Sequence, residues 1–380
     1  MQFHKKRIPQ CCRTFEDYKK FERVAIHFHQ LKVKDIRKET SDCVSIAFEI
    51  AQEIEKDFQF IPGQNITLKK SFNGEEIRRS YSICSCPSEN ELRVAVKKVE
   101  GGIFSTFANE ELKEGDVLEV LPPTGNFYTP IIVSQKKNYV FIAAGSGITP
   151  VISLIKTILA TEKESQVTLL YGNKTVTSVI FKEQLEALKD KFLQRFNVHY
   201  VFSRETAESV FNNGRINGEK LETLSRLVNF NSVDNFFICG PEPLIYSAKD
   251  FLLKWGIDPD KIHFELFTTP TQEHTQIYTA VKPTEEEGSN ITMRIDGRSF
   301  EFKLDYNGKS ILDAGLDHGA DLPFACKGGV CCTCKAKLIE GRVDMEANYG
   351  LEKSEVKAGY ILTCQSHPRT KKVVVDYDQA

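Results

Sequence analysis

Alternating apolar and polar residues, interrupted by turn signals, occupy residues 24–132. The pattern predicts strands at Ile26–Val33, Cys43–Glu49, Asn65–Lys70, Arg79–Ser82, Leu92–Lys98 and Val117–Leu121. Turn pairs such as Pro62-Gly63 and Pro122-Pro123 separate these strands, and helical periodicity is confined to a short stretch near Ile103–Asn109. Short strands at this spacing predict a small antiparallel β-barrel.

Strand and helix patterns alternate through residues 133–268. The predicted strands are Tyr139–Ala144, Val167–Tyr171, Val198–Phe202 and Phe236–Cys239, and the predicted helices are Val151–Leu159, Val179–Lys191, Gly218–Leu227 and Pro243–Trp255. Strands that alternate with helices are typical of a parallel, doubly wound α/β sheet. A second domain of this class is therefore expected.

Residues 269–289 combine prolines, a run of glutamates and little periodicity, which predicts a linker. Residues 290–380 then predict an α+β domain, with a hairpin at Ile291–Ile295 and Ser299–Leu304, a helix at Ser310–His318 and a last strand at Lys372–Tyr377. Residues 1–23 are expected to be a poorly ordered extension.

Bulk composition excludes several classes of protein. The 380 residues are 41% hydrophobic and 27% charged, which is ordinary for a globular chain of more than one domain. A formal net charge of −2 gives no global electrostatic case for nucleic acid or an anionic membrane. No apolar run approaches the ~20 residues of a membrane span. Eleven cysteines without a secretory h-region predict a reducing, cytoplasmic location.

The cysteines of the last domain form the strongest motif. Cys326, Cys331 and Cys334 are spaced C-x4-C-x2-C, and Cys364 follows farther along the chain. This plant-type spacing supplies four thiolates to a [2Fe-2S] cluster, and glycines inside the loop let it fold tightly. A zinc site and unrelated buried cysteines are the alternatives, although zinc sites usually repeat C-x2-C pairs. Cys332, between two predicted ligands, is expected not to bind metal.

A glycine-rich turn, Gly145-Ser146-Gly147-Ile148-Thr149-Pro150, joins a predicted strand to a predicted helix. Glycines there allow backbone to approach a pyrophosphate, and the helix N-terminus supplies free N–H donors. The pattern ends in proline where the dinucleotide fingerprint has glycine, and proline is compatible with an early helical position. A turn that merely connects strand to helix is the alternative.

Two further strand ends lie at the predicted carboxyl edge of the same sheet, where open α/β sheets bind ligands. Cys239 and Gly240 end one strand, and a buried structural cysteine is the alternative. Ser203 and Arg204 follow another strand and could hold an adenosine 2′-phosphate, although a solvated arginine fits equally. This favours NADPH and leaves NADH possible.

The barrel contains a cation, an aromatic ring and hydroxyls on one strand, Arg79-Ser80-Tyr81-Ser82. Alternation places Arg79 and Tyr81 on one side and the two serines on the other. These groups suit a flavin that carries a phosphate tail. The turn Gly101–Thr106 precedes a short helix and offers a second pyrophosphate site. Ordinary strand and turn residues are the alternative for each.

Together the motifs resemble the ferredoxin-NADP reductase superfamily fused to a C-terminal plant-type ferredoxin, over residues 24–380. Within it, the cysteine loop, Glu340–Asn348 and Gly359–Gln365 look like the reductase subunits of phenylacetyl-CoA epoxidase systems. The resemblance implies a β-grasp fold for the last domain. It implies that FAD is held by Arg79, Tyr81, Ser82, Gly102, Ser105 and Thr106, and the nicotinamide by Gly145, Gly147, Thr149, Cys239 and Gly240. It places the 2′-phosphate on Ser203 and Arg204. As weaker matches, Glu265 and Phe267 would close the flavin pocket and Arg215 would assist the 2′-phosphate.

The resemblance also implies a function, in which electrons pass from NADPH to FAD, to a [2Fe-2S] cluster and then to a partner di-iron oxygenase that acts on phenylacetyl-CoA in phenylacetate degradation. Ser82 and Cys239 would lie beside the flavin, and no side chain need act as a general acid or base. The alternatives are a reductase for another oxygenase, hydroxylase or desaturase, and an electron-transfer module or redox sensor without turnover.

Overall fold

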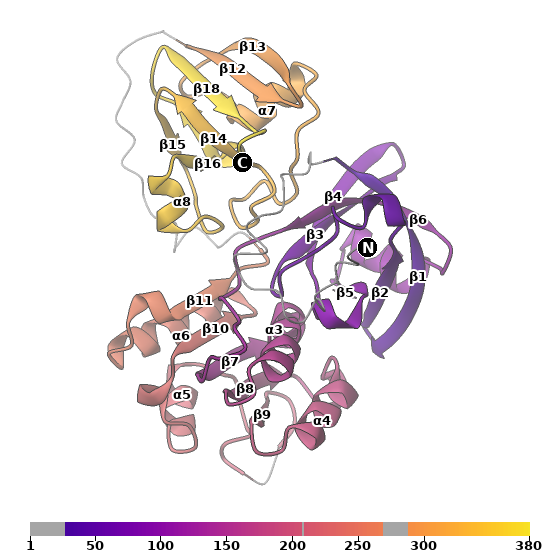
Figure 1. Cartoon of the computed structure of the whole chain (residues 1–380), viewed down its shortest axis with the longest axis vertical. Helices are drawn as coiled ribbons and strands as arrows, with labels where there is room; N and C mark the ends of the chain where they lie inside the picture. The colour runs from indigo at the N-terminus through magenta and orange to yellow at the C-terminus, as the bar shows by residue number, and fades with distance from the viewer. Residues whose placement is uncertain (1–26, 207–208, 269–287) are drawn as a thin grey trace, which may run out of the picture.

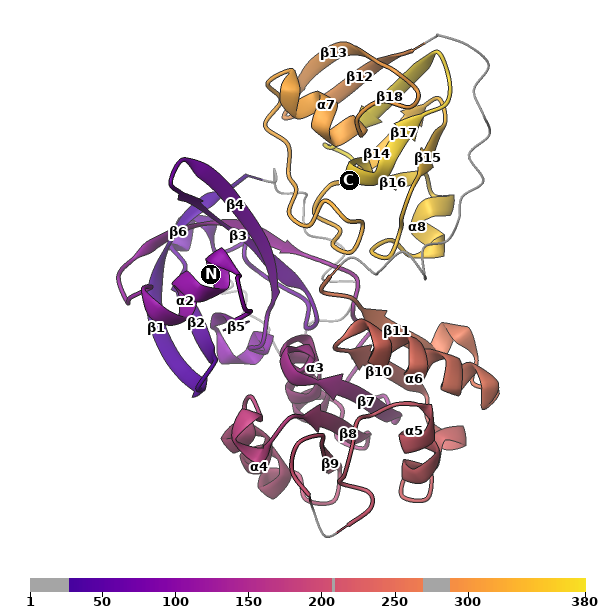
Figure 2. The ribbon, with the colours of Figure 1, turned by 180° about the vertical axis from the view of Figure 1, so that it is seen from behind.

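The computed structural model describes residues 27–206, 209–268 and 288–380, which form the three domains drawn in Figures 1 and 2. The predicted extension and residues 269–287 of the predicted linker lie outside these ranges. Ser289 already belongs to a strand of the last domain, so this residue was wrongly included in the linker.

The first domain is an antiparallel barrel. Its elements are β1 (His29–Thr40), β2 (Cys43–Glu49), β3 (Asn65–Phe72), β4 (Glu75–Ser82), β5 (Leu92–Lys97), α2 (Ile103–Glu110) and β6 (Val117–Thr124). The strand order is β4-β3-β6-β1-β2-β5, and a bridge between Ile83 and Val94 joins the two edges. β1 is longer than predicted, because charged residues beyond Val33 still pair with β2.

The second domain is a parallel sheet with helices on both faces. Its elements are β7 (Asn138–Ala144), α3 (Ile148–Thr161), β8 (Gln166–Asn173), α4 (Lys182–Lys191), β9 (Phe196–Phe202), α5 (Gly218–Leu224), β10 (Asn235–Cys239), α6 (Glu242–Lys254) and β11 (Ile262–Glu265). The strand order is β11-β10-β7-β8-β9. Alternation along the buried β7 sends Tyr139 and Phe141 to the α3 side and Val140 and Ile142 to the α5 and α6 side.

The third domain joins a five-stranded mixed sheet to a short helix, as a β-grasp fold requires. Its elements are β12 (Ser289–Ile295), β13 (Arg298–Leu304), α7 (Ile311–Asp317), β14 (Lys335–Glu340), β15 (Val343–Met345), α8 (Lys353–Lys357), β16 (Tyr360–Leu362), β17 (Ser366–Pro368) and β18 (Lys372–Asp376). The sheet order is β13-β12-β18-β14-β16, with β12 parallel to β18. The short strands β15 to β17 and the edge strand β11 of the second domain were not predicted, because they are too short to show a period.

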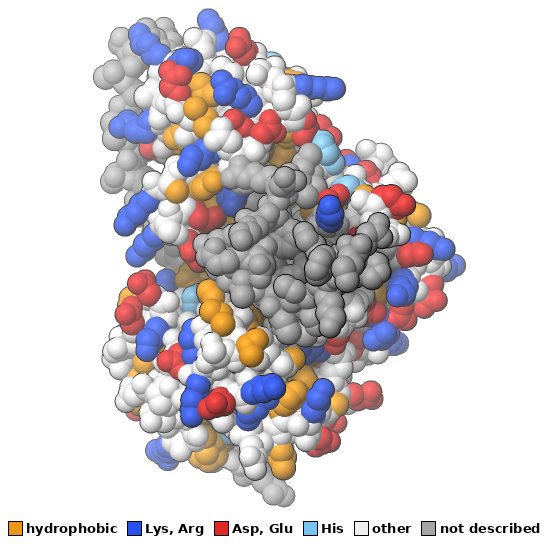
Figure 3. Space-filling model, viewed as in Figure 1, with side chains coloured by type: hydrophobic (Ala, Val, Ile, Leu, Met, Phe, Trp, Pro, Cys, Tyr) orange, Lys and Arg blue, Asp and Glu red, His pale blue; other side chains and the backbone are white. Residues whose placement is uncertain are grey.

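The third domain lies against both of the others, beside β3 and β4 of the barrel and near β11 (Figures 1 and 2). Val330 of its cysteine loop shares a hydrophobic cluster with Leu244 and Leu266 of the second domain. Lysines, arginines and carboxylates are interspersed over the visible face (Figure 3). None of the helices in the described part of the chain is long and apolar enough to cross a membrane.

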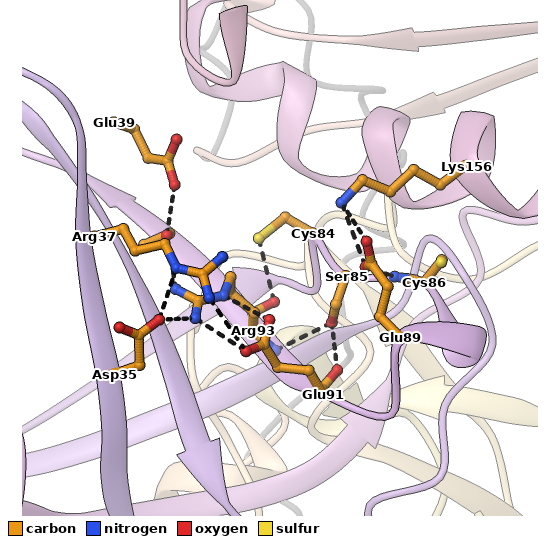
Figure 4. Close-up of polar contacts among 11 residues, drawn as sticks. Asp35, Arg37, Glu39, Cys84, Ser85, Cys86, Glu89, Glu91, Arg93 and Lys156 are labelled. Carbon is orange, nitrogen blue, oxygen red and sulfur yellow. Dashed lines mark hydrogen bonds and ion pairs between the residues drawn. The ribbon is translucent and has the colours of Figure 1, made fainter. Parts of the chain in front are cut away.

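A buried arginine ties β5 to its neighbours in the barrel (Figure 4). The Arg93 side chain is 4% exposed, pairs with Asp35 and, through Nε at 2.7 Å, with Glu91, and donates to Ser45 Oγ at 2.9 Å. Hydrogen bonding from Arg93 lowers the pKa of Glu91. Arg93 is the buried cation that Asp35 and Glu91 share, whereas their other cationic partner, Arg37, is exposed, so the network stabilises the β1, β2 and β5 side of the barrel.

We expect Arg93→Met to destabilise the barrel by about 2 kcal/mol, since it removes the buried cation and leaves the two partly buried carboxylates with the exposed Arg37 alone. Arg37→Met is the matched control. Arg37 also contacts Asp35, at 2.8 Å, but is 56% exposed, so its loss is expected to cost less than about 1 kcal/mol. Urea denaturation followed by circular dichroism measures both variants, and equal shifts in their midpoints would contradict this account.

Candidate functional site

The four predicted cluster ligands stand as two pairs of thiols. Cys326 Sγ and Cys331 Sγ are 3.2 Å apart, and Cys334 is hydrogen-bonded to Cys364. The hydrogen bond from Cys326 lowers the pKa of Cys331, and that from Cys334 lowers the pKa of Cys364. Within the described ranges, no three His, Cys, Asp or Glu side chains are grouped as for one metal ion. Two thiol pairs fit a two-iron centre, which takes two thiolates on each iron.

Backbone N–H groups of the cysteine loop point at sulfur. Gly328 N donates to Cys326 Sγ at 3.3 Å, and Cys331 N donates to the same atom at 3.5 Å. Gly329 has φ +74°, and a Cβ there would meet Ala347 O at 2.9 Å. The loop therefore needs glycine at this position, and its N–H groups can stabilise thiolate ligands of a cluster.

Cys332 points away from the four paired thiols. Its Sγ donates to Gly350 O at 2.8 Å, and Asn126 Nδ2 of the barrel lies 3.6 Å from the same sulfur. Burial raises the pKa of this thiol. The contacts support its assignment as a non-ligand.

The flavin motif of the barrel divides between the two sides of β4. Arg79 is exposed, and the ring centroids of Tyr81 and Phe104 are 5.6 Å apart. Because Phe104 lies in the first turn of α2, this contact brings the N-terminus of α2 beside the Arg79 and Tyr81 side of β4. A cation, an aromatic face and free helix N–H groups are thereby gathered, as a dinucleotide flavin requires.

Ser105 and Thr106 lie in the first turn of α2, after Gly102 at its N-cap. Ser105 Oγ accepts from Val99 N at 3.1 Å and donates to Gly102 O at 3.2 Å, and a Cβ on Gly102 would lie 2.5 Å from this hydroxyl. The Ser105 hydroxyl thus shapes the turn. What the turn offers a phosphate is its backbone N–H groups.

On the opposite side of β4, Ser82 contacts the carboxyl of Glu265, where the three domains meet. Ser82 Oγ donates to Glu265 Oε2, at the end of β11, at 3.3 Å. Burial raises the pKa of Glu265 to about 8, outweighing the hydrogen bonds from Ser82 and Asn65, and Cys331 acts in the same direction as burial. Asn65 Oδ1, opposite Ser82 in the β3–β4 register, is buried without a partner among the described residues. An acceptor held this way fits a ring N–H of a flavin.

The nicotinamide motif brings two strand ends into contact. A Cβ on Gly147 would lie 2.0 Å from Cys239 O and 2.7 Å from Gly240 N, so only glycine allows this approach. Cys239 is fully buried, which raises the pKa of its thiol, and it pairs with Glu265 in the parallel register. The predicted residues Gly147, Cys239 and Gly240 therefore meet beside the Glu265 carboxyl.

The remaining predicted NADP residues differ in what they contact. Thr149 Oγ1 donates to Ser146 O at 3.0 Å and closes the turn that begins at Gly145. Ser203 and Arg204 are exposed at the end of β9, where Ser203 N donates to Asn173 O of the neighbouring strand at 3.0 Å. The exposed side chain of Arg204 therefore lies at the carboxyl edge of the sheet, where the 2′-phosphate was predicted. Arg215 and Phe267 are also exposed.

Sequence reasoning missed several residues of this junction. Asn65 lies two residues after the turn at Pro62-Gly63, and Asn126 directly follows Gly125, so each is an amide close to a turn signal. Thr67 and Thr333 approach at 3.4 Å between hydroxyl oxygens, across the boundary between barrel and third domain. No local pattern distinguishes these residues, since their partners lie in other domains.

Comparisons with known proteins agree with this geometry. Three family models match: the oxidoreductase FAD-binding domain at residues 30–128, the oxidoreductase NAD-binding domain at 141–250 and the 2Fe-2S iron-sulfur cluster binding domain at 293–369. In fold, phthalate dioxygenase reductase, a modular structure for electron transfer from pyridine nucleotides to [2Fe-2S], matches with a TM-score of 0.55 and 23% identity, over 92% of this chain and 98% of that one.

Two curated relatives match over nearly their whole length. One of the subunits of 1,2-phenylacetyl-CoA epoxidase from Escherichia coli K12 is 47% identical over 92% of this chain and 98% of its own. The ferredoxin reductase component of 3-ketosteroid-9-alpha-monooxygenase from Rhodococcus rhodochrous is 32% identical over 91% and 96%. The chain therefore belongs to the family of oxygenase reductase components, which join FAD-binding, NAD-binding and 2Fe-2S cluster-binding domains in one polypeptide.

Proposed function

We propose that this protein is the NADPH-dependent reductase of a di-iron oxygenase that epoxidises phenylacetyl-CoA in phenylacetate degradation. As an oxidoreductase of this family, it delivers electrons to an oxygenase. The observation that carries the finer assignment is the 47% identity to the E. coli epoxidase polypeptide, since the other relative described serves a ketosteroid monooxygenase and is 32% identical.

The residues of the junction support this function by their placement. When bound, FAD accepts two electrons together from the nicotinamide and passes them singly to the [2Fe-2S] centre. Gly147 and Gly240 let the nicotinamide-binding turns close on Cys239, and Ser82 meets Glu265 beside them. Residues predicted to bind FAD and the nicotinamide therefore lie together at this junction.

Two further observations support the proposed coenzyme preference and cellular location. The exposed Arg204 and Ser203 offer a cation and a hydroxyl at the end of β9, which favours NADPH because its 2′-phosphate needs a charged partner. The nine cysteines in the described ranges are free thiols, which suits the reducing cytoplasm.

The assignment is tested by reconstitution. The holoprotein is combined with NADPH, phenylacetyl-CoA, oxygen and the oxygenase components of the E. coli epoxidase, and we expect phenylacetyl-CoA to be consumed. The oxygenase component of the ketosteroid system is the control partner. Equal or faster turnover with the control partner would overturn the assignment.

In Arg204→Ala, the KM for NADPH is expected to rise by about 10- to 100-fold while that for NADH stays unchanged, since a charge-assisted contact is lost.

The cysteine assignment predicts that loss of a cluster ligand abolishes the reduction of cytochrome c but not that of ferricyanide. Cys331→Ala is expected to lose the cluster and NADPH-driven cytochrome c reduction, while NADPH still bleaches the flavin and ferricyanide is still reduced. Cys332→Ala is the matched control and should keep its iron and both activities, because its thiol contacts Gly350 O and Asn126. Loss of the cluster in Cys332→Ala would reverse the ligand assignment.

The buried carboxyl predicts a pH dependence of stability. The Glu265 pKa of about 8 in the folded chain lies above its ordinary value of 4.5. Between these values the unfolded chain binds fewer protons than the folded one, so the contribution of Glu265 to stability falls as pH rises.

Glu265→Gln removes this dependence. Its thermal midpoint, relative to wild type, is therefore expected to rise between about pH 5 and about pH 8. Glu219→Gln, at an exposed carboxylate of α5, is the control and should show a constant difference across the same range.

A further inference from the structure

One strand of the barrel, β4, contains the flavin motif and also contacts the third domain. On β4, Arg78, Ser80 and Ser82 lie on one side, while Arg79 and Tyr81 lie on the other. Arg78 Nη1 donates to Leu322 O at 3.0 Å, and the guanidinium carbon lies 3.9 Å from the centre of the Phe324 ring. Arg78 thus meets the third domain, while the adjacent Arg79 is exposed on the other side of the strand.

Arg78 is an unusual residue to find at such a boundary, because it is a charged side chain only 7% exposed. Its Nε donates to Glu76 at 2.7 Å, and Phe28 covers it at 4.9 Å. Boundaries between domains of one chain are ordinarily polar and permit relative motion. A desolvated guanidinium that is hydrogen-bonded and stacked restricts that motion, since separation would leave it without these partners.

Contacts from β4 and from the paired strand β3 reach the cysteine loop at both of its ends. Leu322 and Phe324 precede Cys326, and Thr333 lies between Cys331 and Cys334. Ser80 Oγ is 3.1 Å from Thr67 Oγ1, which is 3.4 Å from Thr333 Oγ1. Both threonines are buried, so these hydroxyls have no access to water as a substitute partner.

A third contact supports the same arrangement from the end of β6. Asn126 Nδ2 donates to Glu355 Oε2 at 2.6 Å and to Gly350 O at 3.3 Å, both in the third domain. The cysteine loop is therefore held to the barrel by an arginine, a threonine pair and an asparagine. Arg78 differs from the other contacts because it combines a hydrogen bond to Leu322 O with stacking on the Phe324 ring.

We propose that Arg78 is a positioning residue for electron transfer inside the protein, acting by holding the cysteine loop of the third domain against the flavin-binding barrel. The proposal rests on the flavin and cluster assignments of the proposed function. Electron transfer slows steeply as the distance between donor and acceptor grows, so a contact that fixes the loop controls the rate of this step. Lysine cannot replace Arg78, because an ammonium group lacks the planar, stacking fork.

The test separates flavin reduction from transfer to the cluster in the holoprotein. In Arg78→Met and Arg78→Lys, we expect the rate of flavin reduction by NADPH, the KM for NADPH, ferricyanide reduction and iron content to stay within about twofold of wild type. Flavin-to-cluster transfer in stopped flow, and kcat for cytochrome c, should fall by at least about tenfold. Arg37→Met, an exposed barrel arginine, should match wild type in every assay.

Phe324→Leu probes the same contact from the other domain, in case Arg78 variants do not fold. It should give the same split between acceptors, and the double variant Arg78→Met with Phe324→Leu should lose little more than either single change, because both remove one interaction. Unchanged cytochrome c reduction in both single variants overturns the proposal. An equal fall in ferricyanide and cytochrome c reduction also overturns it, since that points to damage at the flavin.

Hydrogen exchange provides a readout that does not depend on electron transfer. Amides of residues 322–334 should exchange faster in Arg78→Met than in wild type or Arg37→Met. Unchanged exchange would count against the proposal that Arg78 holds the loop. Wild-type protein that neither bleaches its flavin with NADPH nor reduces its cluster would contradict the proposed function instead, and the exchange data would still decide whether Arg78 holds the loop.

Discussion

The alternation of side chains along a β-strand is the constraint on which this structure depends. Successive residues of β4 point to opposite faces, so one strand presents Tyr81 toward α2 and Ser82 toward Glu265. A slip of one residue in the β3–β4 register would exchange these faces. The full pairing of β3 with β4, from Asn65–Ser82 to Phe72–Glu75, prevents that slip.

The junction of the three domains combines burial with a small number of polar groups. Glu265, Cys239 and Ser82 each come from the end of a strand, and the parallel register sets Cys239 beside Glu265. Burial raises the pKa of the Glu265 carboxyl and of the Cys239 thiol, so both groups favour the neutral form near neutral pH. The protein contributes positions and electrostatics here, while the bound groups supply the redox chemistry.

Close backbone approach is the second requirement at this junction. The turn after β7 touches the end of β10 so closely that a single methyl group on Gly147 would collide with Cys239 O. The cysteine loop has the same requirement at Gly329, which meets Ala347 O. In both places glycine is needed because two backbone segments lie too close together for a side chain to fit between them.

Local pattern was enough to predict the barrel, the parallel sheet and the hairpin of the last domain, and it singled out four cysteines that the fold brings together as two thiol pairs. Strand alternation, helical period and C-x4-C-x2-C spacing are properties of neighbouring residues, and they survive in the folded chain because each element satisfies its backbone hydrogen bonds in a regular pattern. Short edge elements such as β11 and β15 carry too few residues for a period to appear.

Tertiary structure alone decided that Arg78, rather than its neighbour Arg79, meets the third domain. Arg78 and Leu322 are 244 positions apart, and Ser82 and Glu265 are 183 apart. The sequence by itself determined the elements and the chemical groups on them. Their partners depended on how three domains come together, because hydrogen bonds, burial and stacking act over a few ångströms of space, whatever the separation along the chain.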